Sequence, residues 1–150
     1  MKKFHFSLRP VAVLRSHREL SAREALASAI LACAQAEERR GAARARIEEL
    51  ALAICGGRRE RFSVRDEAAF GQIYRRECAA EAEAGRQVAA ARAAVEQRRE
   101  AYIEASRQVK MVSRLEERAR NVHRMAGLRS EQATLDEIAS RRVPPGGFSS

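Results

Sequence analysis

The stretch that decides the fold is AREALASAILACAQAEERRGAARARIEELALAI, residues 22–54. Small or apolar residues recur in it at alternating steps of four and three, with Arg40 as the single polar member. This is the spacing of a coiled-coil seam, sustained over more than four heptads. We therefore predict a long helix whose seam consists of Ala22, Leu26, Ala29, Cys33, Ala36, Arg40, Ala43, Ile47, Leu50 and Ile54.

A second helix with the same spacing is predicted in the other half of the chain. Its regular seam contains Val88, Ala91, Val95, Arg98, Tyr102, Ala105, Val109 and Val112. Before it, with a slip near Ala84 to Val88, the same side holds Phe70, Ile73, Tyr74, Ala80 and Ala84. After another slip the stripe continues through Leu115, Val122, Met125, Leu128, Leu135 and Ile138. Slips of this kind locally change the supercoil of two packed helices.

The ends of both helices carry recognisable signals. Upstream of Ala22, an apolar stripe of Leu8, Val11 and Leu14 implies a stutter, and Pro10 suits a first helical turn. Gly56 and Gly57 predict a helix terminus, because glycine takes positive φ without strain. Ser63, three residues before Asp66, resembles a cap for the next helix. The expected elements are a helix over about 7–55, a turn over about 56–65 and a helix over about 66–142.

Composition agrees with an all-α chain. Alanine supplies 30 of the 150 residues, and the three prolines stand at 10, 144 and 145, outside the predicted helix interiors. Two long helices joined by a short turn fold back as an antiparallel coiled-coil hairpin, a single domain over 1–142, with the second helix overhanging the first by roughly 25 to 30 residues. Residues 143–150 are expected to be a flexible tail. A β-rich fold, a doubly wound fold and most enzymes with a pocket are excluded.

The net charge of +9 is unevenly distributed along the sequence. Residues 1–23 carry a net +5 and residues 107–142 a net +4, while residues 24–106 hold fourteen charges of each sign. In an antiparallel hairpin the two basic stretches meet at the open end. We therefore expect an acidic partner at that end.

No residues stand in a pattern that indicates catalysis. Cys33, Cys55 and Cys78 are read as reduced thiols, because they are odd in number and no secretory signal precedes them. The three histidines, at 5, 17 and 123, lack metal-ligand spacing, and no nucleotide-binding glycine motif is present. No window approaches the length of a membrane span. The chain is expected to be cytoplasmic and not an enzyme, with no cofactor and no metal.

Both ends of the chain resemble the FliJ family. The opening FHFSLRPVAVLRSHRELSAREALASAI is similar to the start of these proteins, through Phe4, Phe6, Leu8, Val13, Leu14, Arg15 and Glu19. The closing RLEERARNVHRMAGLRSEQATLDEIASRR resembles their carboxyl-terminal signature, through Glu131, Gln132, Leu135, Asp136, Glu137, Ala139 and Arg142. His123 departs from the pattern, which usually has an aromatic residue there, often Tyr.

The resemblance implies a stalk role in flagellar type III protein export, and hence in motility. Family members bind the hexameric export ATPase and promote assembly of its ring, contact the cytoplasmic domain of the export-gate membrane protein, and exchange with export chaperones. They work at the inner face of the cell membrane without inserting into it. Carried onto this chain, the expected ATPase-binding residues are Phe4, Phe6, Leu8, Arg9, Leu14, Arg15, Gln132, Leu135, Asp136, Glu137, Arg141 and Arg142.

The expected gate-binding residues are Phe70 and Tyr74, which are four apart and share one helix face. If that face is turned outward, which we favour, the two rings form a small patch for a partner; if it is turned inward, they pack on Ile47 and Leu50. Two other functions stay open: an adaptor of a virulence type III system, and a nucleic-acid-binding helical hairpin. The fourteen acidic residues of the middle region would repel a polyanion, so no nucleic acid is expected.

Overall fold

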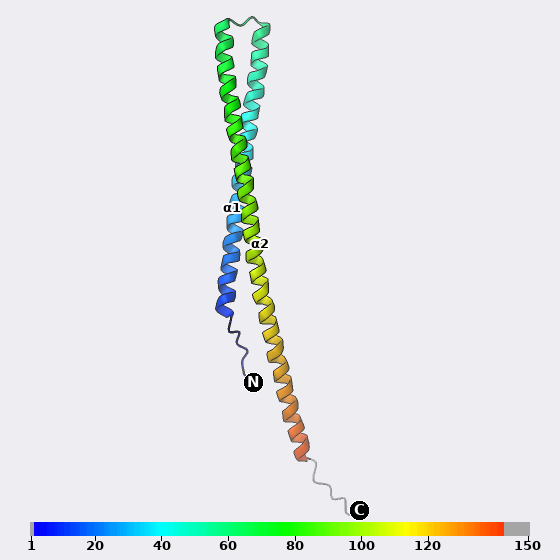
Figure 1. Cartoon of the computed structure of the whole chain (residues 1–150). Helices are drawn as coiled ribbons and strands as arrows, with labels where there is room; N and C mark the ends of the chain where they lie inside the picture. The colour runs from blue at the N-terminus through cyan, green and yellow to red at the C-terminus, as the bar shows by residue number, and fades with distance from the viewer. Residues whose placement is uncertain (1, 143–150) are drawn as a thin grey trace, which may run out of the picture. The chain divides into compact units, whose positions relative to one another are not determined.

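The computed structural model describes residues 2–142. It contains two helices, α1 (Arg9–Arg59) and α2 (Val64–Arg142), of 51 and 79 residues (Figure 1). The described residues include no strand. The two helices pack against each other, which confirms the prediction of an all-α hairpin. The predicted tail, 143–150, lies outside the described residues.

α1 begins at Arg9, two residues later than predicted, with Pro10 in its first turn as expected. The Arg9 N–H donates to the Phe6 carbonyl at 3.2 Å, and the Ala12 N–H donates to the Leu8 carbonyl at 2.9 Å. Residues 2–6 are not helical and lead into this turn. The fixed φ of Pro10 and its missing N–H cost nothing at such a position.

The end of α1 corrects the prediction of a helix terminus at Gly56 and Gly57. The helix continues through both glycines to Arg59, and the residue with positive φ is Arg61, at 65°. The Phe62 N–H donates to the Gly57 carbonyl at 3.1 Å, the pattern of a Schellman motif. A Cβ on Gly57 would lie 1.6 Å from the Phe62 ring. Glycine is therefore required at 57 for the close approach of Phe62 and not to end the helix.

α2 begins at Val64, directly after the predicted cap. The Ser63 hydroxyl accepts from the Asp66 N–H at 3.2 Å, while the Ser63 N–H donates to the Asp66 carboxylate at 3.3 Å. This reciprocal pair is a capping box and satisfies two backbone donors that the helix leaves free. The connection between the helices is thus residues 60–63, shorter than the 56–65 expected.

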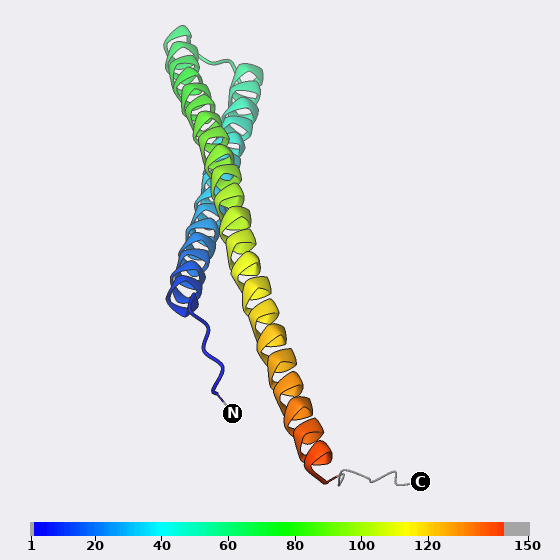
Figure 2. The ribbon, with the colours of Figure 1, turned by 60° about the horizontal axis from the view of Figure 1, so that its bottom comes forward.

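By its packing the chain divides into two compact units. Unit 1 combines the segment up to Arg18 with the segment from Ser106 onward, and unit 2 is the continuous segment Glu19–Ala105. Unit 2 contains the turn and the parts of both helices that flank it, which run in opposite directions (Figure 2).

The core of unit 2 is a narrow seam of small side chains. All ten positions predicted for the α1 seam are buried or half-buried, with Ala36 and Ala43 only 3% and 2% exposed. On α2 the seam runs through Glu77 and Glu81 to Val88 at regular steps of four and three, so the predicted slip near Ala84 is wrong. A pattern of apolar residues alone does not reveal this regular spacing, because Glu77 and Glu81 are charged. Three residues assigned to this seam are exposed instead: Ile73, Ala80 and Arg98.

Ion pairs between the helices set the register of unit 2. Arg40 and Arg44 both reach the Glu81 carboxylate, at 3.0 and 3.1 Å, and Arg46 reaches Glu77 at 3.0 Å. The residue numbers of each such pair add to nearly the same value, as antiparallel pairing requires. Further pairs of this kind join Arg58 to Glu67 and Arg92 to Glu37.

The seam at the start of α1 also differs from the prediction. The covered residues there are Ala12, Arg15 and Glu19, which reach Ala22 at regular steps without a stutter. The residues predicted to form that stripe are exposed by 36% to 50%: Leu8, Val11 and Leu14. The aliphatic stem of Arg15 can cover a seam while its guanidinium reaches water, so a charged residue replaces an apolar one.

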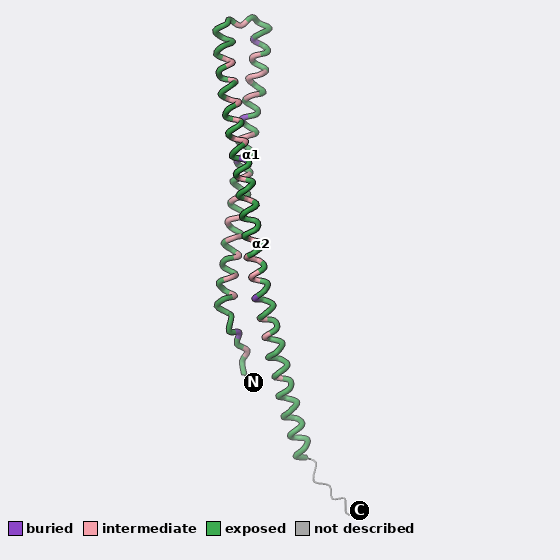
Figure 3. The backbone as a smooth tube through the Cα atoms, in the orientation of Figure 1, coloured by how far each residue is buried: buried purple, intermediate pink, exposed green. Residues whose placement is uncertain are grey.

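The last part of α2 has no covered stripe. In unit 1 the half-buried residues Glu116 and Ala119 continue the regular spacing from Val112, which is 3% exposed. From Leu128 to Arg142 every residue is exposed, as Figure 3 shows by its colour. The stripe predicted to continue the seam is therefore outside it, and its members are exposed by 45% to 69%: Leu115, Val122, Met125, Leu128, Leu135 and Ile138.

Candidate partner-binding surface

Unit 1 holds the whole net charge of the chain. It contains fourteen Lys and Arg residues against five acidic residues, a net +9, while unit 2 contains fifteen of each sign. The two basic stretches of the sequence are thus brought together in one compact unit. A field of one sign attracts a partner of the opposite sign and speeds its association.

The amino-terminal segment is held on α2 by aromatic contacts. Phe6 is 9% exposed, the most buried aromatic residue of the described chain. The Phe4 ring lies edge-on to the His123 imidazole, with centroids 5.5 Å apart, and the Arg120 guanidinium carbon lies 5.4 Å from the same ring. His123 Nε2 is also 3.0 Å from the Lys2 carbonyl oxygen. The residue that departs from the family pattern therefore anchors the start of the chain.

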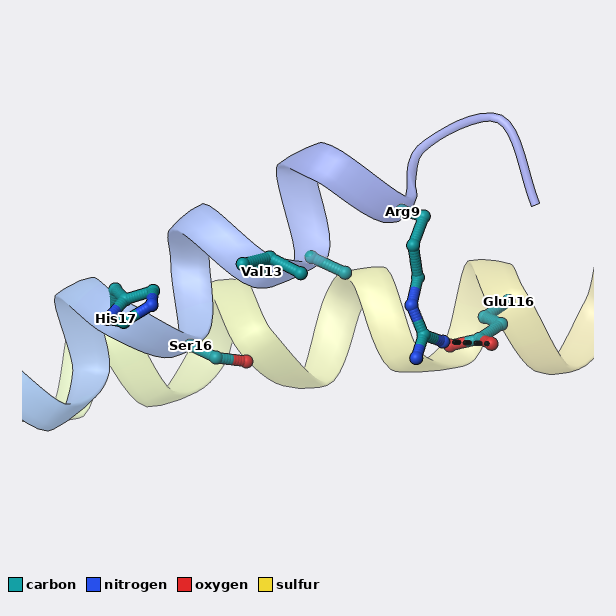
Figure 4. A pocket seen from close by; sticks show the side chains of 6 residues that line it. Arg9, Val13, Ser16, His17 and Glu116 are labelled. Atoms are coloured by element: carbon teal, nitrogen blue, oxygen red, sulfur yellow. Dashed lines mark hydrogen bonds and ion pairs between the residues drawn. The ribbon is translucent and has the colours of Figure 1, made fainter.

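Polar contacts continue this attachment along the first turns of α1. Arg9 Nη1 lies 3.4 Å from Glu116 Oε1 (Figure 4). The same Glu116 oxygen accepts from Arg120 at 2.9 Å. Arg15 Nη1 donates to the Gln108 carbonyl at 3.3 Å. Because α2 ends 26 residues after Glu116, the helix overhang agrees with the 25 to 30 residues predicted. Beside the Arg9–Glu116 pair is an open pocket of about 380 Å³, lined by Arg9, Ala12, Val13, Ser16, His17 and Glu116.

The carboxyl-terminal group of predicted site residues lies on the overhang of α2. Gln132 donates to Asp136 at 3.0 Å and Arg141 to Glu137 at 2.6 Å, each one helical turn away. Leu135 is 61% exposed and lines an open hollow of about 940 Å³ together with Leu128 and Lys2. All twelve residues predicted for ATPase binding therefore fall in unit 1, the first six on its amino-terminal segment and the others on the overhang.

The two residues predicted for gate binding lie in unit 2, which has no net charge. Phe70 and Tyr74 are both half-buried, so the outward-facing alternative is wrong. The Phe70 ring stacks on Phe62, with centroids 5.0 Å apart and planes 9° from parallel. Phe70 thus belongs to the packing of the turn, because the Schellman motif brings Phe62 onto the same side.

One carboxylate of unit 2 has a shifted pKa. Hydrogen bonds from Arg40 and then Arg44 hold the pKa of Glu81 below its ordinary value of 4.5. Cys33, Cys55 and Cys78 are free. Among the described residues no three His, Cys, Asp or Glu side chains are grouped to hold a metal ion, and no helix is apolar enough over sufficient length to cross a membrane.

Sequence reasoning missed several residues that shape these surfaces. Phe62 had no signal, because its role depends on the geometry of the turn. Arg120 had none either, since only the return of the amino-terminal segment places Phe4 beneath it. His123 could have been found, because it stood out as a departure from the family pattern.

A two-helix all-α hairpin with a basic unit that holds both ends of the described chain defines the class of long helical-hairpin proteins. The family model described as flagellar FliJ protein matches residues 4–144, nearly the whole sequence, so the chain belongs to the FliJ family. Membership implies a stalk role in flagellar protein export. Neither the curated proteins nor the solved structures contain a significant match.

Proposed function

We propose that this chain is a non-enzymatic stalk component of the flagellar type III export apparatus, and that unit 1 binds the hexameric export ATPase and promotes assembly of its ring. The observation that carries the proposal is that the whole net charge of +9 lies in the unit that contains both family-like ends. Its site of action is the cytoplasm, at the inner face of the membrane beneath the flagellum.

The contacts within unit 1 support two different roles for its residues, in packing the helices and in binding the ATPase. Arg9 and Arg15 are engaged with Glu116 and with the Gln108 carbonyl, so their first role is to hold α1 on α2. Leu135 and Arg142, in contrast, are exposed on the overhang. We assign the direct contact with the ATPase to the overhang and the amino-terminal segment together, with Arg9 and Arg15 fixing their arrangement.

The test is the ATPase rate of the cognate export ATPase with and without this chain. We expect Arg141→Glu with Arg142→Glu to remove most of the stimulation at physiological salt, because the change reverses two exposed positive charges in the binding unit. The matched control is Arg75→Glu with Arg76→Glu, a neighbouring pair of exposed arginines in unit 2. Equal stimulation by the wild type and the overhang variant, with helicity unchanged in circular dichroism, would contradict the proposal.

The contacts with the export gate and with export chaperones are a second part of the proposal. Phe70 and Tyr74 are half-buried, so their substitution by Ala is expected to reduce thermal stability as well as gate binding. Binding measured on the folded fraction of each variant separates the two effects. Gate affinity that remains unchanged in that fraction would remove both residues from the gate site.

A further inference from the structure

Unit 1 has a row of exposed apolar residues that runs beside the seam of each helix. On α1, Val11, Leu14 and Arg18 each precede by one position a covered residue, Ala12, Arg15 or Glu19. One residue corresponds to a rotation of 100°, so this row lies on one flank of the seam and not within it.

The same relation holds on α2. Met111, Leu115 and Arg118 each precede by one position a covered residue, Val112, Glu116 or Ala119. Val122 and Met125 continue this row at the same steps of four and three. Such a spacing is that of a second heptad seam on the same helix.

Both rows face the same side of unit 1. Equivalent positions of two antiparallel helices lie on the same flank, because a two-fold axis relates the helices. The Arg15 bond to the Gln108 carbonyl agrees, since Gln108 also precedes a covered residue, Val109. Residues that follow the seam, such as Val13 and Ser16, line the pocket on the opposite flank (Figure 4).

This free heptad face is apolar and carries positive charge only. It consists of Val11, Leu14, Met111, Leu115, Val122 and Met125, exposed by 36% to 69%, with Arg18 and Arg118 in the same two rows. None of the five acidic residues of unit 1 stands in either row. On the opposite flank, the α2 residues that follow the seam are polar, as Ser113, Glu117 and Arg120 illustrate.

We propose that the free heptad face binds an acidic amphipathic helix, which packs on α1 and α2 as a third strand of the coiled coil. The heptad spacing of both rows requires a partner that is itself a helix, since only a helix repeats its contacts at that period. The positive residues require acidic side chains beside its apolar stripe. A second copy of this chain is disfavoured, because the two faces would bring Arg18 and Arg118 against like charges.

The inference adds to the proposed function the kind of element that docks on unit 1, and it rests on that function only for the identity of the protein that supplies the helix. The probe is a labelled peptide of about four heptads with Leu at its a and d positions and Glu at its e and g positions. Repulsion between the Glu rows opposes self-association of the peptide. Its binding to the full chain is measured by fluorescence anisotropy.

We expect the heptad peptide to bind the wild-type chain, and Leu14→Glu with Leu115→Glu to weaken binding by about tenfold or more. The matched control is Val13→Glu with Leu135→Glu, which adds the same charge at exposed Leu or Val positions off the face. Leu14→Ala with Leu115→Ala repeats the test without adding charge. Circular dichroism checks that each variant is helical.

Results of three kinds, on the peptide, on its scrambled form and on the control measurements, would overturn the inference. The first is no binding of the heptad peptide to the wild-type chain at low salt. The second is equal binding of a scrambled peptide of the same composition, which would show that positive charge alone accounts for the binding. The third is an equal loss in the control variant, or binding of anionic phospholipid vesicles through this face in place of the peptide. None of these measurements includes the ATPase, so the stimulation assay remains an independent test of the proposed function.

Discussion

The two units are built from the same pair of helices, yet their side chains have different roles. In unit 2 charges of opposite sign balance, and arginines of α1 bind glutamates of α2, as Arg40 and Arg44 bind Glu81. In unit 1 the charges do not balance, and large apolar residues such as Leu14 and Leu115 remain exposed. Unit 2 satisfies its own side chains, whereas unit 1 leaves both charge and apolar surface available to a partner.

The difference shows two ways in which helices packed through a narrow seam are held in one register. The seam of unit 2 contains many small side chains, which bury little area, and its ion pairs between the helices support the same register. Unit 1 joins its helices through the Arg9–Glu116 pair and adds a different device, the extended segment in which Phe4 contacts His123 and Phe6 is buried. The ion pairs of unit 2 neutralise charge, whereas the aromatic contacts of the extended segment do not.

The largest effect on stability is expected at the turn of unit 2. Gly57→Ala places a Cβ 1.6 Å from the Phe62 ring, which stacks on Phe70, so we expect a loss of about 1–3 kcal/mol in the free energy of unfolding. Gly56→Ala is the control. Nothing lies within 4 Å of its Cβ, and it should gain up to about 1 kcal/mol as alanine favours helix. Thermal unfolding measures both, and equal shifts would show that Phe62 does not pack on Gly57.

A smaller effect, confined to unit 1, is expected at His123. His123→Ala removes the contact with the Lys2 carbonyl and the edge of the Phe4 ring, which together are worth about 1 kcal/mol. Hydrogen exchange in residues 2–12 should become faster while exchange in residues 19–105 is unchanged. His17→Ala serves as the control for loss of a histidine from the same unit. Slower or unchanged exchange near the amino terminus would mean that His123 does not anchor this segment.

The smallest effect is a change in how stability depends on pH in unit 2. The pKa of Glu81 is lower in the folded chain than its ordinary value of 4.5, so its ionised form stabilises the fold above that pH. This contribution is lost as pH falls through the folded pKa. We therefore expect Glu81→Gln to lower the melting temperature slightly near pH 7 and to have less effect near pH 3. Glu83→Gln, which removes an ion pair with Arg86 on the same helix, is the comparison. A loss that is larger at low pH would contradict the assignment.

Much of the fold could be predicted from the sequence, because apolar periodicity reports burial directly. The α1 seam from Ala22 to Ile54 is confirmed. Periodicity failed where a charged residue occupies the seam, as Arg15, Glu77 and Glu81 do. A pattern of apolar residues does not reveal a glutamate that is covered because an arginine of the other helix binds it.

The candidate site could be predicted in outline only. Charge counting along the sequence located the basic unit, because net charge does not depend on side-chain placement. Exposure could not be predicted in this way. The apolar pattern predicts that Leu14 and Leu115 are covered, and both are exposed. The face that Phe70 shares with Tyr74 is predicted to be exposed, and Phe70 stacks on Phe62. Which side of a helix is covered depends on the register of its partner, and that register is set by pairs distant in sequence.

The most direct test of the claim that unit 1 is the binding unit is hydrogen exchange along the whole chain, with and without the cognate export ATPase. We expect protection upon binding in residues 2–18 and 106–142, and no change in residues 19–105. Protection restricted to residues 19–105, with unit 1 exchanging as in the free chain, would contradict the claim.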